Sequence, residues 1–450
     1  MNRKPYPCYK ASGVPWLGEV PEHWDVKRLK MASQLSDKKV EADDANPLPY
    51  IGLENIESWT GKLLSIDPDV APTGIAHSFQ AEHTLFGKLR PYLAKACNPD
   101  FPGLCSTELL VIEGKNFDRR ALLYWMLADG FVNLVDSSTY GSKMPRANWN
   151  FIGNCRLPVP PRPEQTAIAD FLDRQTGRID LLMQKKRELI ARLKEKRTAL
   201  VARTVTRGLP PDAAREFGLE PHTRFKDSGI DWLGEVPEGW EIIPLKFKFP
   251  RLYSGVSVNS ENIPVKDGLM GILKTSCVHG NYFHPEENKK VLDDELGRVI
   301  CPVTENSLII SRMNTPDLVG NCGYVEIDHP TLYLPDRLWI AQFSKHKAMH
   351  GKFAWYLVTS HGLSCLNGVL ATGTSGSMKN LSQDAFLNIV VALPAEVEQT
   401  VIATYLDRET AKLDRLTEKV KTAITRLQEY RTALITAAVT GKIDVREQAA

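Results

Sequence analysis

The pattern of apolar positions divides the chain into two long helical stretches, each preceded by a block of mixed character. From Pro163 to Arg203 and from Glu396 to Val439 the sequence runs almost without Gly or Pro. Each stretch is long enough for a helix of roughly 60 Å at 1.5 Å per residue. In both, apolar residues recur at alternating steps of four and three, a 3.5-residue period typical of a coiled-coil seam.

The two stretches align without a gap at an offset of 234, and the predicted seam takes the same frame in both. Its apolar members are Ile168, Leu172, Ile179, Leu182, Leu189, Leu193, Leu200, Ile402, Leu406, Leu413, Leu416, Val420, Leu427 and Leu434. Polar residues interrupt the frame at Gln175, Lys186, Lys196 and Glu409, where they could fix the register. Because neither helix can bury its stripe alone, we expect the two to pack on each other. The alternative is two unrelated solvated helices, which the shared frame disfavours.

A second repeat precedes each long helix. Residues 12–30 (SGVPWLGEVPEHWDVKRLK) and 228–246 (SGIDWLGEVPEGWEIIPLK) are identical at twelve of nineteen positions, including two tryptophans. The chain therefore reads as an internal duplication of a block followed by a helix. We assign the tryptophans a structural role, pinning the entrance of each block against the base of a helix, in preference to base stacking.

Each block mixes short strands with helices and lacks a βαβ rhythm, which predicts an α+β fold. Predicted strands cover residues 48–53, 83–86, 108–112, 270–273, 307–310, 323–327 and 339–343. Predicted helices cover 119–127 and 353–359, and polar loops follow at 137–146 and 372–377.

Composition adds few positive signals. Hydrophobic content is 43%, and no apolar run approaches the ~20 residues of a membrane span. The amino-terminal residues lack the apolar core of a secretory signal. Eight cysteines show no CxxC and no metal spacing, so we expect reduced cytosolic thiols, mostly buried, and no metal site. Net charge is +2, but residues 164–207 hold eleven Lys or Arg against six Asp or Glu. Such a face suits a polyanion, although a solvated helix face is the commoner explanation.

Motifs of common catalysts do not occur in the sequence. There is no GxxxxGK[ST], GxGxxG, HExxH or GxSxG. Asn98-Pro-Asp-Phe101 superficially resembles the pocket of adenine methyltransferases but lacks the second proline and any upstream glycine-rich loop. We expect no catalytic residues on this chain.

Taken together, the repeats resemble the specificity (S) subunit of type I restriction–modification systems over nearly the whole length. The resemblance rests on residues 12–30 and 228–246, on both EQT…LD helix starts and on the RTALI–AVTGKIDV ending. Residues 85–95 (LFGKLRPYLAK) and 314–320 (NTPDLVG) also look like segments of this family's target-recognition domains.

The resemblance implies two globular target-recognition domains, residues 1–157 and, with a linker, 212–393. Residues 158–211 and 394–450 would be two long helices forming an antiparallel coiled coil with pseudo-two-fold symmetry. Each domain would read half of a bipartite site in double-stranded DNA. The coiled coil would set the spacer and dock two methyltransferase (modification) subunits. The chain would be cytoplasmic and non-catalytic, with S-adenosylmethionine, ATP and Mg on partner subunits, restriction/translocase subunits being further candidates.

Candidate DNA contacts lie in two segments of each block. They are Lys88, Arg90, Lys95, Ser142, Lys143 and Arg146 in the first block and Arg312, Asn314, Thr374, Ser375, Lys379 and Asn380 in the second. Arg and Asn make bidentate contacts to guanine and adenine, whereas Lys, Ser and Thr suit phosphates. Because the blocks differ in sequence, the two half-sites should differ. Ordinary surface polar residues remain the alternative for about half of this set.

Two other classes of function stay open from the sequence. A self-contained methyltransferase or nuclease would bind its cofactor as an isolated chain. A coiled-coil assembly scaffold would lack salt-sensitive DNA binding, with and without partners.

Overall fold

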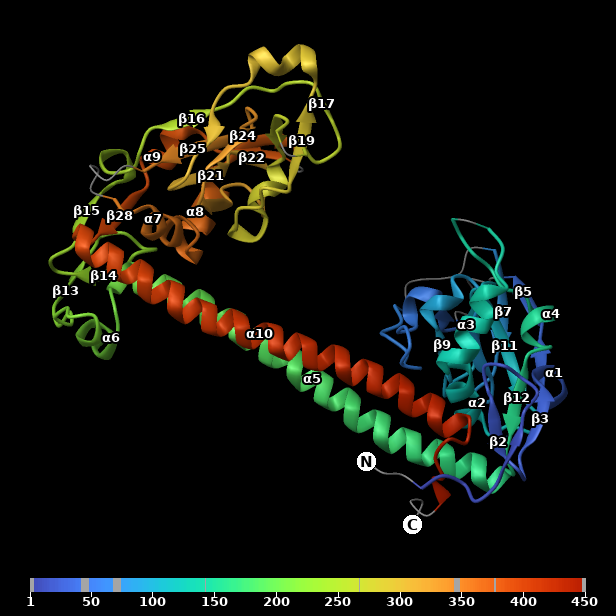
Figure 1. The fold of residues 1–450 in the computed structure, drawn as a ribbon. Helices are drawn as coiled ribbons and strands as arrows, with labels where there is room; N and C mark the ends of the chain where they lie inside the picture. Colours follow the sequence, from blue (N-terminus) through green and yellow to red (C-terminus); the bar gives the residue numbers. More distant parts are fainter. Residues whose placement is uncertain are drawn as a thin grey trace. The chain divides into compact units, whose positions relative to one another are not determined.

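The computed structural model describes residues 4–41, 48–67, 74–141, 143–266, 268–343, 349–375 and 378–446. The chain divides into two compact units. Unit 1 comprises Met1–Glu188 and Val420–Ala450, and unit 2 comprises Leu189–Lys419. Each unit holds a globular α+β part and one end of each long helix, α5 (Arg162–Arg207) and α10 (Glu396–Val439) (Figure 1). No helix in these described ranges is long and apolar enough to cross a membrane.

Two four-stranded sheets form the centre of unit 1, in the orders β5-β7-β10-β6 and β4-β11-β8-β9. Their strands are β4 (Ser33–Ser36), β5 (Lys39–Glu41), β6 (Tyr50–Ile51), β7 (Ile75–Phe79), β8 (Thr84–Gly87), β9 (Ala96–Cys97), β10 (Gly103–Cys105) and β11 (Leu109–Gly114). Alternate residues of β11 enter different cores: Leu109 and Val111 pack in one, Leu110 and Ile112 in the other. This sheet is therefore buried on both faces, which explains its continuous apolar runs.

Helices cover the larger core of unit 1. They are α1 (Leu29–Ala32), α2 (Arg119–Met126), α3 (Asp129–Ser137) and α4 (Trp149–Ile152), with single turns η1 (Leu53–Asn55) and η2 (Pro91–Leu93). Asp118 caps α2 by accepting hydrogen bonds from two backbone amides of its first turn. Trp125 of α2 and Phe131 of α3 are fully buried.

Unit 2 repeats this plan with a four-stranded sheet, β16-β25-β21-β23, and a five-stranded sheet, β17-β19-β18-β24-β20. The strands are β16 (Leu252–Ser254), β17 (Ser260–Glu261), β18 (Gly271–Leu273), β19 (Asn288–Val291), β20 (Pro302–Val303), β21 (Ser307–Ser311), β23 (Cys322–Val325), β24 (His329–Tyr333) and β25 (Leu338–Gln342). The helices and turns are η3 (Leu245–Phe247), η4 (Thr275–Asn281), η5 (Asp293–Arg298), α6 (Pro211–Glu216), α7 (Gly351–Val358), α8 (His361–Leu370) and α9 (Gln383–Leu387). Leu308 and Ile310 of β21 face one core and Ile309 the other, as in β11.

The α+β prediction is confirmed, and every strand named from the sequence is present with its ends shifted by at most two residues. Helices α3 and α8 were not anticipated. The loop predicted at 372–377 begins as a strand, β26 (Thr372–Ser375), and residues 376–377 lie outside the described residues.

The repeated tryptophans lie where the blocks meet the long helices. In both units a hairpin leads into a two-stranded pair. In unit 1 these are β1 (Tyr9–Ala11) with β2 (Glu19–Pro21), and β3 (Asp25–Arg28) with β12 (Arg156–Val159). In unit 2 they are β13 (Phe225–Asp227) with β14 (Glu235–Pro237), and β15 (Glu241–Pro244) with β28 (Val390–Leu393). Trp24 is fully buried and packs against Gly441, just past α10, where a Cβ would meet its ring at 3.1 Å. Trp240 donates from Nε1 to Glu398, in the first turn of α10, at 3.2 Å. The predicted structural role is confirmed for Trp24 and Trp240, whereas Trp16 and Trp232 pack against Gly130 of α3 and Gly362 of α8.

The two long helices pack against each other in antiparallel register. In unit 1, Asp180 of α5 pairs with Arg431 of α10 at 3.0 Å. In unit 2, Arg197 pairs with Asp414 at 3.1 Å. Moving forward along α5 therefore moves backward along α10 by the same number of residues. The pairs are related by the offset of 234, as a pseudo-two-fold duplication requires.

Three of the fourteen apolar residues of the predicted seam need correction. Leu182, Leu189 and Leu416 are 44%, 40% and 43% exposed, so they lie on the flank of the helix pair and not in its seam. At most of the alternate positions of the frame, the less exposed residue is the one that directly follows the predicted one. The seam residues are Leu172, Thr176, Ile179, Met183, Lys186, Ile190, Leu193, Arg197, Leu200 and Thr204 on α5 and Leu406, Thr410, Leu413, Thr417, Val420, Ile424, Leu427, Arg431, Leu434 and Ala438 on α10. The error arose because leucine is a common residue of coiled-coil seams, whereas Thr and Arg are not.

Candidate nucleic-acid interface

The two candidate DNA-binding segments of unit 1 lie side by side. Leu89 forms an antiparallel bridge with Arg146. The amide of Arg90 donates to the carbonyl of Pro145 at 2.7 Å, and the amide of Ala147 donates to that of Lys88 at 2.9 Å. Residues 88–90 and 145–147 thus form a small paired structure, which we call the two-segment element of unit 1.

The side chains in and beside this element differ in exposure and in whether they are already paired. Arg90 and Lys143 are exposed, and Arg90 adopts a left-handed backbone conformation, φ 50°. Arg146 is held by Glu108, with Nε 3.1 Å from Oε1. Lys88 is half-buried.

Of the two remaining candidates in the first block, the structure describes one. Lys95 is half-buried and donates from Nζ to the carbonyl of Leu53 at 2.6 Å. Ser142 lies outside the described residues.

The corresponding segments of unit 2 also meet. Strand β22 (Met313–Asn314) pairs with β27 (Met378–Asn380), placing Met313 opposite Asn380 and Asn314 opposite Lys379. Strand β26 extends this sheet on the far side of β27. Residues 312–314 and 378–381 form the two-segment element of unit 2. Thr374 and Ser375 belong to β26, but their side chains lie outside the described ones.

Arg312 occupies an unusual environment in this element. Its Cζ lies 5.8 Å from the ring centre of Trp339, a cation–π arrangement. Its Nε is buried without a hydrogen-bond partner among the described groups, as is Oδ1 of Asn380. Buried polar atoms are usually satisfied, so these two mark a place where a further polar group would be favourable.

Asn314 is oriented by its neighbours. Its Nδ2 donates to Oγ of Ser311 at 3.3 Å, and its Oδ1 accepts from the amide of Thr315 at 2.9 Å. Lys379 and Asn380 are half-buried. The structure therefore brings Arg312, Asn314, Lys379 and Asn380 together on one small sheet.

A second set of polar residues, missed from the sequence, joins each block to its helix. In unit 1 the hydroxyl of Tyr124 donates to Asp173 at 2.7 Å, and Arg120 pairs with the same carboxylate at 2.8 Å. Burial, and then the charge of Asp173, raise the pKa of Tyr124, so this hydroxyl stays a donor.

The same junction recurs in unit 2. Tyr356 donates to Asp407 at 2.8 Å and Lys352 pairs with that carboxylate at 2.8 Å. Burial, and then the charge of Asp407, raise the pKa of Tyr356. The repeated LD dipeptide contains both aspartates, so the helix repeat held a signal for them, whereas the tyrosines lie in blocks of little shared sequence.

The EQT motif has a structural role, which explains why it recurs at the start of both long helices. Gln165 accepts from the amide of Asp118, the capping residue of α2, at 2.7 Å and donates to the carbonyl of Pro160 at 2.9 Å. Gln399 makes the equivalent contacts with His350 and Pro394, both at 2.9 Å. Each glutamine locks a block to the start of its helix.

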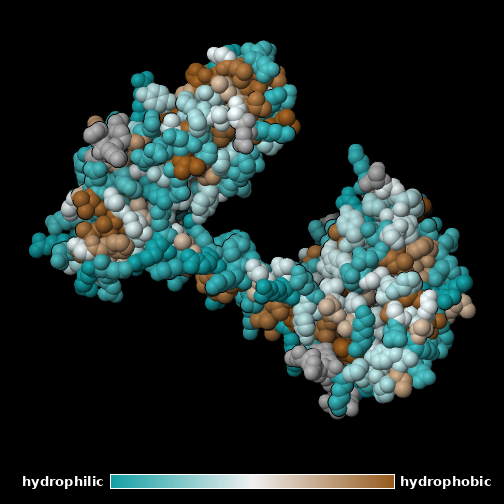
Figure 2. Space-filling model, viewed as in Figure 1, coloured by the Kyte–Doolittle hydropathy of each residue, from teal (hydrophilic) through white to brown (hydrophobic). Residues whose placement is uncertain are grey.

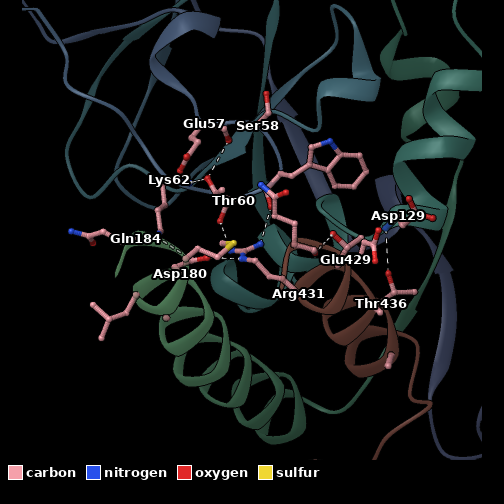
Figure 3. A pocket seen from close by; sticks show the side chains of 18 of the residues that line it. Glu57, Ser58, Thr60, Lys62, Asp129, Asp180, Gln184, Glu429, Arg431 and Thr436 are labelled. Carbon is pink, nitrogen blue, oxygen red and sulfur yellow. Dashed lines mark hydrogen bonds and ion pairs between the residues drawn. The ribbon is translucent and has the colours of Figure 1, made fainter. Parts of the chain in front are cut away.

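The main cavity of unit 1 lies away from the two-segment element, where the 57–62 turn meets α5 and α10 (Figure 3). Its volume is about 1250 Å³. Arg431 reaches into its wall, donating to the carbonyls of Trp59 and Thr60 at 2.8 and 2.9 Å, while Lys62 pairs with Asp180 at 2.7 Å. Within the described ranges, no group of three or more His, Cys, Asp or Glu side chains is placed to hold a metal.

Comparison with known proteins finds similarity to a single family. The model of the type I restriction modification DNA specificity domain matches residues 88–191, which contain the two-segment element of unit 1 and part of α5. The MjaVIII specificity subunit of Methanocaldococcus jannaschii is 25% identical over 95% of this chain and 94% of its own. The EcoKI specificity subunit of Escherichia coli is 22% identical over 96% and 92%. The chain is thus similar to type I restriction–modification specificity subunits over most of its length.

Further comparisons point to the same family. The EcoDI specificity subunit of Escherichia coli is 25% identical over 42% of each chain. The fold also matches that of a solved structure from work on the complex assembly and conformational transition of the type I R-M system. That match has a TM-score of 0.63 and 20% identity over 93% of this chain and 98% of the other. The HsdS subunit from Thermoanaerobacter tengcongensis has a TM-score of 0.50 and 19% identity over 94% and 98%.

Proposed function

We propose that this chain is a specificity subunit that binds double-stranded DNA and reads a bipartite site, one half with each unit. The observation that carries the proposal is the two-segment element, which both units build from paired backbone segments. In each copy it presents Arg, Lys or Asn, the side chains that recognise base edges and phosphates. Two copies of one element, related by the internal duplication, would engage two major-groove segments about one helical turn, roughly 34 Å, apart. The unread bases between them would form the spacer.

The helix pair supplies the second part of the proposal, the docking of two methyltransferase subunits and the setting of the spacer. Leu182 and Leu416 are exposed at equivalent positions of α5 and α10, and apolar side chains also surface along the helix pair in Figure 2. An exposed leucine at the same position in each copy of the repeat would offer two partner subunits equivalent contacts.

In this proposal the chain carries no catalytic step. Methyl transfer from S-adenosylmethionine to adenine belongs to the modification subunits. Steps that use ATP and Mg belong to restriction/translocase subunits. This chain contributes base recognition, the distance between half-sites and the platform for assembly.

A methylation map tests the proposal. The chain is expressed with its cognate modification subunit in a methylation-free host, and the modified adenines are sequenced. We expect a single split motif, two short specific halves around a fixed run of unspecified bases. Methylation that persists without this chain would place specificity elsewhere. A stable complex without methylation or salt-sensitive DNA binding would favour a scaffold, and cofactor binding by the isolated chain would favour an enzyme.

A further inference from the structure

The two-segment elements can be compared position by position, because backbone hydrogen bonds give both the same register. In unit 1 the amide of Ala147 donates to the carbonyl of Lys88 at 2.9 Å. In unit 2 the amide of Leu381 donates to the carbonyl of Arg312 at 2.8 Å. Lys88 therefore corresponds to Arg312, and the positions that follow correspond one by one.

Two independent features support this correspondence. Asn148 caps α4 and Ser382 caps α9, each accepting from a backbone amide three residues on, so both elements end at the same place. Counting back from these caps, Met144 falls on Met378. Both methionines are exposed, by 45% and 42%, at the outer end of the element.

At the position two residues after Lys88 and Arg312, the two units carry different base-reading side chains. Unit 1 has Arg90 and unit 2 has Asn314. Arg90 is exposed and forms no ion pair with any residue that the structure describes. Its backbone is fixed by the hydrogen bond from its amide to Pro145, 2.7 Å long.

Asn314 is held differently but remains competent to bind a base. Its contacts with Ser311 and Thr315 use one hydrogen of Nδ2 and one lone pair of Oδ1. A side-chain amide has two hydrogens on its nitrogen and two lone pairs on its oxygen, so one donor and one acceptor of Asn314 remain in a fixed orientation. That is the complement needed for N7 and N6 of adenine.

We propose that Arg90 and Asn314 read the same position of the two half-sites, and that Arg90 selects guanine where Asn314 selects adenine. The inference rests on the proposed function, because it assumes that both units approach DNA through this element. The Arg fork matches O6 and N7 of guanine, and the Asn amide matches N6 and N7 of adenine. The facing segment carries the same exchange, since Arg146 corresponds to Asn380 by the same register. At this one position the half-site of unit 1 therefore carries guanine where that of unit 2 carries adenine.

The test uses the complex of this chain with its modification subunits and compares methylation maps. Arg90→Asn keeps a residue type that tolerates the left-handed backbone. We expect one guanine position of one half-site to relax or change to adenine, with discrimination falling about 5- to 150-fold. The other half-site should stay unchanged.

Asn314→Asp is the matched variant for unit 2. It is isosteric and keeps the oxygen that accepts from Thr315, but it loses the donor to N7. Discrimination at one adenine should fall about 5- to 150-fold in the opposite half-site from the one that Arg90→Asn affects. Binding of the purified complexes to duplexes with single base changes gives the same comparison without the methylation step.

The outcomes separate the two proposals. A wild-type complex that yields no split motif overturns the proposed function itself. A split motif that neither variant alters overturns only the assignment of Arg90 and Asn314. Changes by both variants in the same half-site, or in bases other than guanine and adenine, would also overturn that assignment.

Discussion

Arg431 of α10 donates from Nε to Oδ1 of Asp180 on α5 across 3.0 Å, and the side chains are only 6% and 9% exposed. The equivalent pair, Arg197 with Asp414, spans 3.1 Å, but its side chains are 28% and 48% exposed. One duplicated contact is thus buried in unit 1 and open to solvent in unit 2. Arg431 is further fixed by the carbonyls of Trp59 and Thr60, so its charge is compensated on several sides.

This difference predicts unequal costs for the same substitution. Arg431→Met leaves Asp180 largely buried, with Lys62 as its remaining ion-pair partner among the described residues, and should lower the free energy of unfolding by about 3 kcal/mol. Arg197→Met exposes Asp414 to water and should cost about 1 kcal/mol or less. Urea unfolding of both variants measures the difference. Equal losses would mean that burial does not govern the contribution of these pairs.

The corrected seam predicts different fates for two neighbouring residues of α5. Met183 is 4% exposed, so Met183→Ser should cost about 2–4 kcal/mol of stability. Leu182 is 44% exposed, and Leu182→Ser should change stability by less than about 0.5 kcal/mol. If the flank docks the methyltransferase, Leu182→Ser should instead weaken complex formation, measured by titration of the modification subunit. A stability loss from Leu182→Ser as large as that from Met183→Ser would restore Leu182 to the seam.

The seam shows what periodicity can and cannot predict. Positions spaced by seven, such as Ile179 and Leu193, are buried as the pattern suggested. Several alternate positions were placed one residue early, because an exposed leucine such as Leu189 fits the apolar period as well as the less exposed Ile190 that follows it. Arg197 can occupy the seam since its partner, Asp414, comes from the other helix. Such a compensation between residues far apart in sequence leaves no mark in a local apolar pattern.

The DNA-contact candidates show a similar limit. Residue chemistry placed Arg90 and Asn314 among the candidates, and the shared layout of the blocks paired the segments that contain them; their contact with DNA stays a prediction. Neither predicts that Lys95 is tied to the carbonyl of Leu53 or that Arg146 is tied to Glu108. The register that matches Arg90 to Asn314 depends on backbone pairing, which a sequence of little internal similarity does not reveal.

The junction tyrosines predict a loss of stability in alkali. Burial and a neighbouring aspartate raise the folded-state pKa of Tyr124 and Tyr356 above the unfolded value of about 10. Their contribution is therefore complete below about pH 10 and declines as the pH rises above it, since the unfolded chain releases these protons first. The free energy of unfolding, measured between pH 8 and 11, should fall at the upper end.

The double variant Tyr124→Phe/Tyr356→Phe is the control for this effect. It should be less stable at pH 8, by about 1.5–3 kcal/mol for each lost bond to a carboxylate. Its stability should also fall less steeply above pH 10. An identical slope in both proteins would assign the alkaline loss to other groups, such as buried thiols.

The cysteines should separate clearly in their reactivity. Burial raises the pKa of the Cys97 and Cys105 thiols to about 12, so little thiolate forms near neutral pH. Cys8 and Cys365 are exposed. Labelling of the native protein with a maleimide, followed by mass spectrometry, should modify Cys8 and Cys365 first. Modification of Cys97 at a comparable rate would indicate that the sheet containing it opens readily.

Arg90 combines strain with exposure, and this predicts opposite changes in stability and recognition. A non-glycine residue at φ 50° costs free energy that glycine avoids. Arg90→Gly should therefore raise the free energy of unfolding by about 0.5–1 kcal/mol, after the larger chain entropy of glycine is counted. Arg90→Ala keeps the strain and should leave stability nearly unchanged. Both variants remove the guanidinium, so both should lose discrimination in one half-site to the same extent when the complexes are titrated with single-base-change duplexes. Full recognition by either variant would show that the strain serves the fold of the 88–95 turn and not the reading of DNA.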